Sequence, residues 1–205
     1  MKIDLTEINK QLSGKSPEEI VSWALSFAKK PIITTNFRPF EAAILHLVSK
    51  QKNDIDVVWC DTGYNTPQTY KHAEKIISRL QLNIDLYVPK QTVAHRNSVL
   101  GLPDVNNSKH EIFTEQVKLE PFRRAMNFHE PDVWFTNLRK GQTAFRDSID
   151  VVSQDVKGVV KVSPFYHYTD EALEAYLEEH NLPNEFKYFD PTKVLGHREC
   201  GLHSK

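Results

Sequence analysis

Residues 31–60 read PIITTNFRPFEAAILHLVSKQKNDIDVVWC, and this stretch decides the fold. Its first five residues form a short run rich in β-branched side chains, which is typical of a strand. Residues 40–50 then repeat apolar side chains four positions apart, which predicts an amphipathic helix. Residues 55–60 return to an almost unbroken apolar run, as in a strand that is buried on both faces. A strand, a helix and a second buried strand in this order predict a parallel sheet.

The alternation of strand and helix patterns continues along the rest of the chain. Residues 4–29 predict two short helices before the first strand, whereas residues 93–107 have no clear period and predict a loop. Further strands are expected at 84–88, 132–136 and 158–162, and further helices at 67–80, 112–128 and 169–180. This order predicts an α/β fold with a doubly wound, mostly parallel sheet.

The composition excludes several classes of protein. The chain has 205 residues, of which 26 are basic and 27 acidic, so a general nucleic-acid-binding surface is not expected. Its N-terminus lacks the apolar core of a signal peptide, and no apolar run is long enough to span a membrane. Two distant cysteines, Cys60 and Cys200, cannot form a disulfide framework or a four-thiolate metal site. We therefore expect a cytoplasmic protein that contacts no membrane and keeps its thiols reduced.

Polar side chains gather in the loops after three predicted strands, where doubly wound sheets bind their ligands. The first loop offers hydroxyls and backbone N–H groups at a helix start, which suit a phosphate. The second offers a carboxylate for ribose or adenine, and the third carries three cations. The candidate substrate-binding residues are Thr34, Thr35, Asn36, Arg38, Asp61, Thr62, Gly63, Arg139, Lys140, Gln142 and Arg146. Singly, each group could cap a helix, cap a turn or be a solvated charge; together they predict a nucleotide-binding domain over residues 1–180.

Residues 181–205 contain two prolines, two glycines and little periodicity, so we expect an arm that folds back over a site. The arm holds Cys200, and Arg198, His203 and Lys205 lie within five residues of it. Because a thiol reacts as its thiolate, which nearby cations favour, this pattern predicts a nucleophilic cysteine. An incidental terminal thiol is the alternative. Cys60, at the end of an apolar strand, is expected to be a small buried side chain.

The sequence RECGLH at 198–203 resembles the nucleophile signature of the phosphoadenylyl-sulfate (3'-phosphoadenosine 5'-phosphosulfate, PAPS) reductase family, which has an adenine nucleotide α-hydrolase-like fold. Four more segments resemble that family in the same order: DTGY at 61–64, KLEP at 118–121 with Arg124, LRK at 138–140 with Gln142, and KVSP at 161–164. The resemblance covers roughly residues 31–203 and adds Arg124 and Lys161 to the candidate substrate-binding residues.

The resemblance implies thiol-dependent reduction of PAPS to sulfite and adenosine 3',5'-bisphosphate during assimilatory sulfate reduction. In this reaction Cys200 would become an S-sulfocysteine, and reduced thioredoxin or glutaredoxin would release sulfite. Cys200, Arg198 and His203 are the implied catalytic residues, and Arg139, Lys140 and Arg146 would join His203 in binding the sulfonate oxygens. The implied enzyme is the type without an iron–sulfur cluster, with no bound cofactor or metal. A homodimer is a further expectation.

Two other readings keep the nucleotide fold but change the chemistry. One is an ATP pyrophosphatase-like enzyme that adenylylates its substrate, which a glycine-rich loop after the first strand would favour. Here Phe37, Arg38 and Pro39 stand where the resembling family has a glycine. The other is a non-catalytic, redox-linked nucleotide sensor, which would bind nucleotide without releasing sulfite. The segment 184–196 is shorter than in the resembling family, which leaves both alternatives open.

Overall fold

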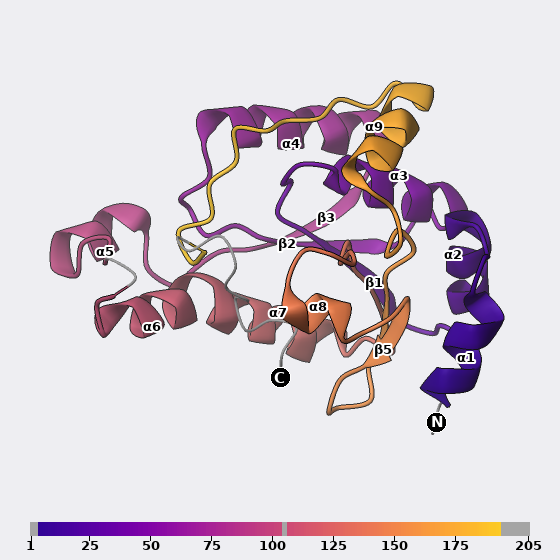
Figure 1. Ribbon diagram of the computed structural model, residues 1–205. Helices are drawn as coiled ribbons and strands as arrows, with labels where there is room; N and C mark the ends of the chain where they lie inside the picture. Colours follow the sequence, from indigo (N-terminus) through magenta and orange to yellow (C-terminus); the bar gives the residue numbers. More distant parts are fainter. Residues whose placement is uncertain (1–3, 104–105, 194–205) are drawn as a thin grey trace.

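The computed structural model describes residues 4–103 and 106–193. Within them, a six-stranded sheet has the order β3-β2-β1-β4-β6-β5, and every neighbouring pair is parallel except β5 with β6 (Figure 1). The strands are β1 Pro31–Thr35, β2 Asp56–Cys60, β3 Asn83–Tyr87, β4 Val133–Phe135, β5 Val152–Gln154 and β6 Val160–Val162. The predicted doubly wound, mostly parallel α/β fold is confirmed.

Helices cover both faces of the sheet (Figure 1). On one face lie α3 Glu41–Gln51, α4 Pro67–Leu80 and α9 Asp170–Glu179, with α2 Pro17–Leu25 packed on α3. On the other face α7 Glu120–His129 packs on β2 and β3. It continues α6 Lys109–Thr114 through the π-helical turn η1 Glu115–Leu119. The remaining helices are α1 Leu5–Leu12, α5 Val93–Val99 and α8 Ala144–Asp147.

The helices begin where their sequences provide caps. Ser16 and Glu19 form a reciprocal capping box at the start of α2, with Pro17 in the first turn. The Thr66 hydroxyl accepts a hydrogen bond from the Thr69 N–H at the start of α4, and Thr169 caps α9 in the same way. These local signals explain why the helices predicted to begin at residues 67 and 169 begin within one residue of those positions. The helix predicted at 112–128 is instead the three consecutive elements α6, η1 and α7, and it begins at Lys109, where no side-chain hydrogen bond caps it.

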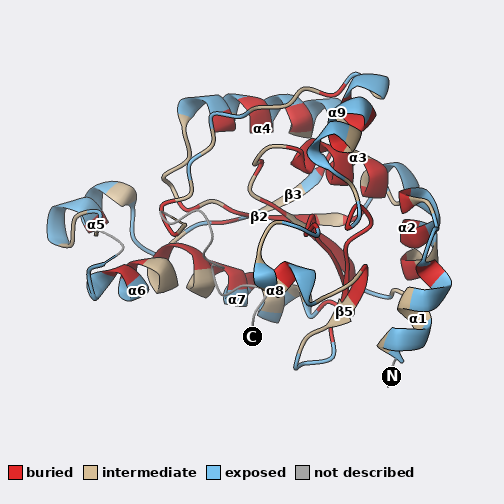
Figure 2. Ribbon diagram, in the orientation of Figure 1, coloured by how far each residue is buried: buried red, intermediate tan, exposed pale blue. Residues whose placement is uncertain are grey.

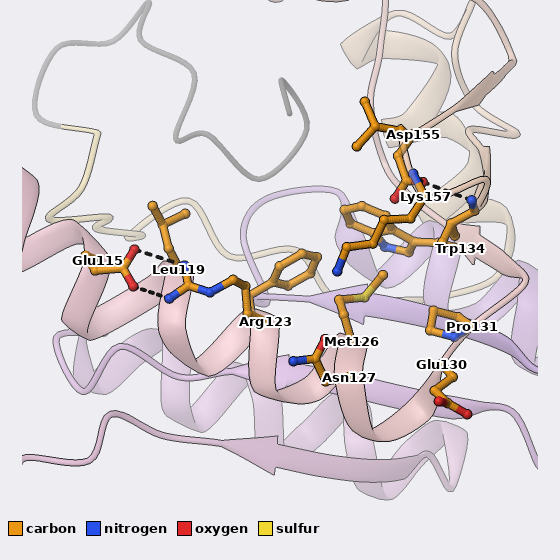
Figure 3. A pocket seen from close by; sticks show the side chains of 13 residues that line it. Glu115, Leu119, Arg123, Met126, Asn127, Glu130, Pro131, Trp134, Asp155 and Lys157 are labelled. Carbon is orange, nitrogen blue, oxygen red and sulfur yellow. Dashed lines mark hydrogen bonds and ion pairs between the residues drawn. The ribbon is translucent and has the colours of Figure 1, made fainter.

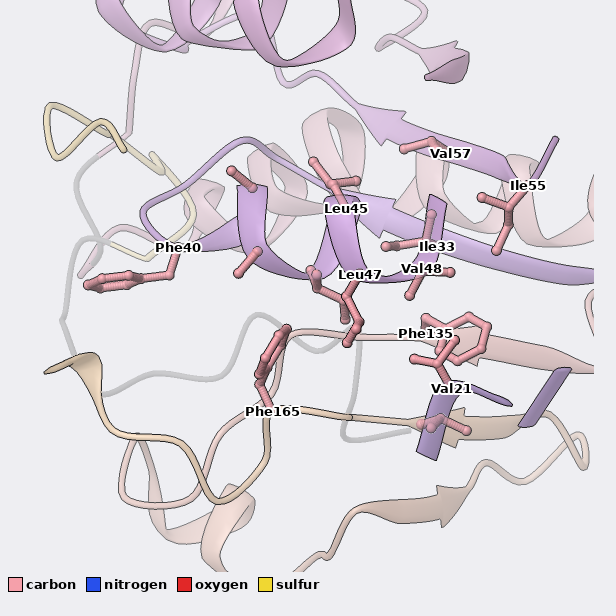
Figure 4. Close-up of a cluster of buried hydrophobic side chains, with 14 of the residues drawn as sticks. Val21, Ile33, Phe40, Leu45, Leu47, Val48, Ile55, Val57, Phe135 and Phe165 are labelled. Atoms are coloured by element: carbon pink, nitrogen blue, oxygen red, sulfur yellow. The ribbon is translucent and has the colours of Figure 1, made fainter. Parts of the chain in front are cut away.

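Successive side chains of the central strands enter opposite cores, as the pleat of a strand requires. Ile33, Val57 and Phe135 point to the α3 side, where they pack with Val21, Leu45 and other apolar side chains (Figure 4). Their neighbours Ile32, Val58 and Trp134 point to the α7 side. Strands β1, β2 and β4 are therefore buried on both faces (Figure 2), which is why they have almost continuous apolar sequences. The edge strand β3 is partly exposed.

The prediction that residues 93–107 are a loop was wrong for the first half of that segment. Residues Val93–Val99 form α5, and the Thr92 hydroxyl caps it by accepting from the His95 N–H. Contacts with the loop after β2 hold α5 in place, and the helix has no apolar face. Its sequence therefore lacks the apolar periodicity by which a helix is recognised. The short elements β5 and α8 were also not predicted, since three or four residues give no periodicity.

Gly63 fixes the contact between that loop and α5. Its φ of +80° lies in the left-handed region, and a Cβ there would approach Val93 Cγ2 to 2.6 Å. We expect Gly63→Ala to lower the free energy of unfolding by about 1–3 kcal/mol in urea titrations. Gly14→Ala is the matched control, because Gly14 has a φ of +77° with nothing within 4 Å. Equal losses in both variants would mean that the Val93 contact contributes nothing.

The described part of the C-terminal arm, 181–193, forms neither helix nor strand. It leaves α9 and runs beside α4 toward the carboxyl end of the sheet (Figure 1). The described helices include none whose length and apolar character would let it cross a bilayer.

Candidate active site

A cavity of about 140 Å³ lies at the carboxyl ends of β1 and β4, which we call the strand-end cavity. Strands β1 and β4 are adjacent but lie on opposite sides of the point where the strand order reverses, which is where doubly wound sheets bind ligands. The cavity is lined by Thr34, Thr35, Asn36, Arg38, Glu41, Lys118, Thr136, Asn137, Leu138, Arg146, Tyr188, Asp190 and Lys193. Five predicted residues therefore meet there: Thr34, Thr35, Asn36, Arg38 and Arg146.

Glu41, at the start of α3, organises the loop after β1. It is 5% exposed, and its carboxylate accepts hydrogen bonds from the Thr35 hydroxyl at 2.8 Å, the Asn36 N–H at 2.8 Å and Arg38 Nε at 2.7 Å. The sequence predicted that these groups would hold a phosphate. In the structure Glu41 takes up the donors of Thr35 and Asn36, so the negative charge favoured at this helix start is already present.

Cations from separate elements converge on the same cavity. Lys118, in η1, is 2% exposed, and its Nζ lies 2.5 Å from Asp190 Oδ2 and 3.2 Å from Thr192 Oγ1. Arg38 bridges Glu41 and the Asn137 carbonyl oxygen, while Arg146, in α8, donates to Gln142 Oε1. This concentration of positive charge suits an anionic ligand in a low-dielectric setting.

Asn137 supplies a group of a different kind. The residue is 6% exposed, and its side-chain Oδ1 accepts no hydrogen bond from the residues that the structure describes. A buried acceptor without a partner costs free energy, so its presence in a cavity lining indicates a ligand donor such as an amine or hydroxyl. The cavity thus combines cations for an anion with an acceptor for a polar hydrogen.

The arm closes the strand-end cavity. Its Lys187 carbonyl oxygen accepts hydrogen bonds from the hydroxyls of Thr66 and Thr69, and Asn184 Oδ1 accepts from the Phe40 N–H. Phe186 packs edge-on against Phe40 with ring centroids 5.7 Å apart. With the arm in place the cavity is smaller than the roughly 300–1,000 Å³ typical of ligand pockets. A nucleotide-sized ligand therefore requires the arm to move.

The loop after β2 lies beside this cavity rather than in its lining. Asp61 accepts hydrogen bonds from the Gly63 N–H, Asn65 Nδ2 and the Tyr70 hydroxyl. Burial and the Asp61 charge together raise the pKa of Tyr70 to about 12, so the phenol stays a donor. Asp61, Thr62 and Gly63 therefore build a rigid turn, and the predicted contact of Asp61 with ribose would have to compete with these bonds.

Three predicted residues line a second hollow of about 460 Å³: Arg139, Lys140 and Gln142. Arg139 is 8% exposed. Its Nη1 lies 2.5 Å from Asp170 Oδ1, and its guanidinium carbon lies 5.3 Å from the centroid of the Phe40 ring.

Arg124 and Lys161 line neither the strand-end cavity nor the second hollow. Arg124 donates to the Val88 carbonyl oxygen, and Lys161 Nζ is 5.4 Å from the Trp134 ring centroid. Burial lowers the pKa of Lys161.

A third cavity, of about 680 Å³, lies between α7 and the β5–β6 turn (Figure 3). Phe122, Met126 and Trp134 form its apolar part, and at one end Arg123 is paired with Glu115. Pro131 and Val159 place it near the amino ends of β4 and β6, away from the edge where ligand groups gather. Because it lies at the amino ends of these strands and its lining holds no thiol, this cavity is not the candidate active site.

The phosphoadenosine phosphosulfate reductase domain family matches residues 30–200. The chain belongs to this family. It is 33% identical to the phosphoadenosine 5'-phosphosulfate reductase of Xanthomonas euvesicatoria over 98% of the chain and 92% of that protein. It is also 33% identical to the reductase of Aliivibrio salmonicida, over 97% and 88%. The recognised resemblance is confirmed, and the chain is an oxidoreductase of this family.

Solved structures agree with the assignment to this reductase family. A phosphoadenylyl-sulfate reductase from Candida auris, solved as a phosphate complex, has a TM-score of 0.78 at 26% identity and covers 90% of the chain and 89% of its own. The FMN adenylyltransferase of Candida glabrata shares the fold alone, with a TM-score of 0.59 at 11% identity over 82% and 55%. The adenine nucleotide α-hydrolase type of fold is therefore confirmed.

The predicted catalytic residues of the reductase, Cys200, Arg198 and His203, lie outside the described residues. The other cysteine, Cys60, is buried and free at the end of β2. Burial raises the pKa of its thiol to about 12, although Lys118 and Arg124 oppose the shift. Its burial confirms the prediction of a small buried side chain. The raised pKa keeps the thiol protonated near neutral pH.

Sequence reasoning missed several groups of the strand-end cavity: Glu41, Lys118, Asn137, Tyr188, Asp190 and Lys193. Lys118 belongs to the KLEP segment that resembles the family, but it is not among the predicted site residues. Its signal was a lysine inside an apolar helical pattern, next to buried Val117. The arm residues carried no signal, because their contacts depend on the path of the chain after α9.

Mutation can tell which of two predicted arginines, Arg139 or Arg146, lies at the phosphates of the nucleotide. We expect Arg146→Met to weaken the binding of adenosine 3',5'-bisphosphate about tenfold or more, because Arg146 lines the strand-end cavity. Arg139→Met should have the smaller effect, since Arg139 lines the second hollow and not the strand-end cavity. Isothermal titration of both variants measures the difference. The opposite order would move the anion site to the second hollow.

Proposed function

We propose that this chain reduces PAPS to sulfite and adenosine 3',5'-bisphosphate, with Cys200 as the nucleophile. The observation that carries the proposal is the family match, which extends to residue 200 and so includes this cysteine. The cationic strand-end cavity supports it, because the substrate is a polyanion and the arm that leads to Cys200 passes over that cavity as far as Lys193.

The proposed reaction has two thiol steps. The Cys200 thiolate attacks the sulfonyl sulfur, the bond from that sulfur to the bridging phosphate oxygen breaks, and the bisphosphate leaves with the electron pair. A thiolate of a dithiol donor of the thioredoxin or glutaredoxin type then attacks Cys200 Sγ, and sulfite leaves with the electrons of the S–S bond. The donor's second thiol releases Cys200 and becomes part of a disulfide. Two electrons pass from the dithiol to sulfur.

The side chains of the cavity supply electrostatic stabilisation in this proposal. Lys118, Arg38 and Arg146 would bind the anionic oxygens of the nucleotide, and Asn137 Oδ1 would accept from an amine or hydroxyl of the ligand. Arg198 and His203 would favour the thiolate of Cys200. Because the modified cysteine must leave the nucleotide to meet the donor, the movement of the arm is part of turnover.

Intact-protein mass spectrometry tests the first thiol step. Reduced protein is mixed separately with PAPS and with adenylyl sulfate in the absence of any thiol donor. We expect PAPS to add the mass of one SO₃ group, and peptide mapping to place it on Cys200. No adduct with either nucleotide, while adenosine 3',5'-bisphosphate still binds, would leave the sensor or the adenylylating enzyme as the better reading.

The loop after β1 argues against the adenylylating alternative. A pyrophosphate loop presents free backbone N–H groups at the helix start, whereas here Glu41 accepts from the Asn36 N–H. Phe37 and Phe40 have φ values of +52° and +68°, so the loop adopts a left-handed backbone without glycine.

We further propose a cytoplasmic enzyme without an iron–sulfur cluster, which contacts neither membrane nor nucleic acid and forms a homodimer.

A further inference from the structure

The third cavity, between α7 and the β5–β6 turn, has the size of a ligand site although the proposed reaction does not use it. Its volume of about 680 Å³ lies within the roughly 300–1,000 Å³ typical of small-molecule pockets. It lies near the amino ends of β4 and β6, whereas the strand-end cavity lies at the carboxyl ends of β1 and β4. A molecule in the third cavity would therefore leave the nucleotide site open.

Aromatic and sulfur-containing side chains form the floor of the third cavity. The rings of Phe122 and Trp134 have centroids 5.1 Å apart and are tilted by 45°, and Met126 and Leu119 extend the apolar surface along one side of η1 and α7 (Figure 3). Ring edges and a thioether both make favourable contacts with another aromatic ring. The floor therefore suits a flat, aromatic ligand.

The carboxylates in the lining are already compensated. Both carboxylate oxygens of Glu115 accept from Arg123, and Glu130 lies 3.0 Å from Lys30 Nζ. Asp155 Oδ1 accepts from two backbone N–H groups of the β5–β6 turn, each at 2.9 Å. Arg123 is likewise compensated by its pairing with Glu115. These groups leave no net charge that a ligand would have to balance.

Lys157 adds one positive charge to this lining. Its side chain extends from the β5–β6 turn toward α7 (Figure 3). Within residues 4–103 and 106–193, no acidic side chain lies within ion-pair distance of its Nζ. The Lys157 N–H donates to Asp155, which fixes the backbone from which the side chain starts. A ligand with a single anionic group would complement this ammonium, while its apolar part covers the floor.

Trp134 connects the third cavity with the strand-end cavity. Its ring lines the third cavity, and its Nε1 donates to Thr34 Oγ1 at 3.0 Å, while Thr34 lines the strand-end cavity. Because the Thr34 hydroxyl accepts from the indole, its own proton is directed away from Trp134 and can be donated to a phosphate oxygen. A ligand packed on the floor would hold the indole in place and so orient this donor before the nucleotide binds.

We propose that the third cavity is an effector site for an aromatic monoanion, such as an aryl carboxylate, and that its occupation tightens nucleotide binding through Trp134 and Thr34. The coupling is reciprocal, so a bound nucleotide also tightens the binding of the effector. Binding of the effector does not depend on the proposed reaction; the coupling requires only that the nucleotide occupies the strand-end cavity.

The first test compares 2-naphthoate with uncharged 2-naphthamide by isothermal titration of protein saturated with adenosine 3',5'-bisphosphate, which blocks the nucleotide site. We expect one equivalent of naphthoate to bind, about three- to fivefold more tightly than naphthamide. Lys157→Met should remove this difference, and Lys157→Arg should keep it. Lys75→Met is the matched control, because Lys75 is an exposed lysine of α4, on the other face of the sheet (Figure 1).

Substitution of Met126 tests the floor of the cavity. Met126→Glu places a carboxylate beside the expected anion and should weaken naphthoate binding at least about tenfold, whereas Met126→Leu should change it less than about threefold. Equal binding of naphthoate by wild-type protein, Lys157→Met and Met126→Glu would place the ligand elsewhere and overturn the inference. Sedimentation of the ligand-free protein adds a check: a wild-type dimer that dissociates in Met126→Glu would make this face an interface between copies and would also overturn it.

The second test measures the coupling. Saturating naphthoate should tighten the binding of adenosine 3',5'-bisphosphate to wild-type protein about fivefold. Thr34→Val keeps the shape of the side chain but removes the acceptor for Trp134, so it should still bind naphthoate and lose the tightening. An unchanged affinity for the bisphosphate in wild-type protein would overturn the inference. Failure of the proposed function would instead appear as the absence of a sulfonate adduct while both naphthoate effects remain.

Discussion

Replacement of Cys200 by serine is expected to abolish sulfite release while nucleotide binding is kept. Serine preserves the size of the side chain, but its hydroxyl is not ionised at neutral pH and is a poor nucleophile toward sulfur. We expect kcat with PAPS and reduced thioredoxin to fall at least about 10³-fold. The affinity for adenosine 3',5'-bisphosphate should change less than about threefold. Sulfite release and titration of the bisphosphate measure the two effects.

Cys60→Ser is the matched control for this variant. Cys60 is the other thiol of the chain, and burial keeps it protonated near neutral pH. Its replacement should leave the sulfonate adduct and the rate of its formation nearly unchanged. An adduct that survives in Cys200→Ser and disappears in Cys60→Ser would reverse the two roles and contradict the mechanism.

The sequence predicted the central sheet because the strands themselves carry the information. Ile32 and Ile33 enter opposite cores, as do Val57 and Val58, so each central strand is an apolar run between polar loops. The information for α5 is of another kind. Val93 meets Gly63, and Arg96 meets Tyr64, across about thirty residues of sequence, and no local period reports such contacts.

The sequence predicts the location of the candidate site better than the contacts that its residues make. The rule for strand ends led to Thr34, Arg38 and Arg146, which line one cavity. The role of Thr35 and Asn36 differs from the expectation, because Glu41, five to six positions later in the chain, accepts the hydrogen bonds of their donors. A pattern of residue types does not tell whether a donor is free for a ligand or already bonded within the protein.

The buried pair of Lys118 and Asp190 leads to the second large effect. The two side chains are 3% and 7% exposed, and Asp190 also accepts from the Thr192 hydroxyl. Removal of one partner leaves the other charge buried alone. We therefore expect Lys118→Met to lower the free energy of unfolding by about 3–5 kcal/mol. Lys15→Met, at an exposed ion pair with Glu19, is the control and should change stability little.

The pH dependence of unfolding should report the same pair. Burial alone would raise the pKa of Asp190, but Lys118 and Thr192 outweigh burial and hold it below its ordinary value of 3.8. The folded state then binds this proton less tightly than the unfolded state. The contribution of Asp190 is thus constant above about pH 5 and is lost as the pH falls below about 4. Urea titrations measure this dependence. Between pH 7 and pH 3.5 the free energy of unfolding should fall less in Lys118→Met than in wild-type protein.

A double variant separates the structural role of this pair from its role in binding. Lys118→Met with Asp190→Leu removes both buried charges and should restore stability to within about 1–2 kcal/mol of wild type. It still lacks the Lys118 cation of the strand-end cavity, so adenosine 3',5'-bisphosphate should bind at least about tenfold more weakly. Recovery of binding together with stability would instead show that Lys118 serves only to hold the arm. Asp190→Asn should instead bind the bisphosphate more tightly, because a bound phosphate then supplies the negative charge that Lys118 has lost. The bisphosphate should therefore raise the melting temperature of this variant more than that of wild-type protein.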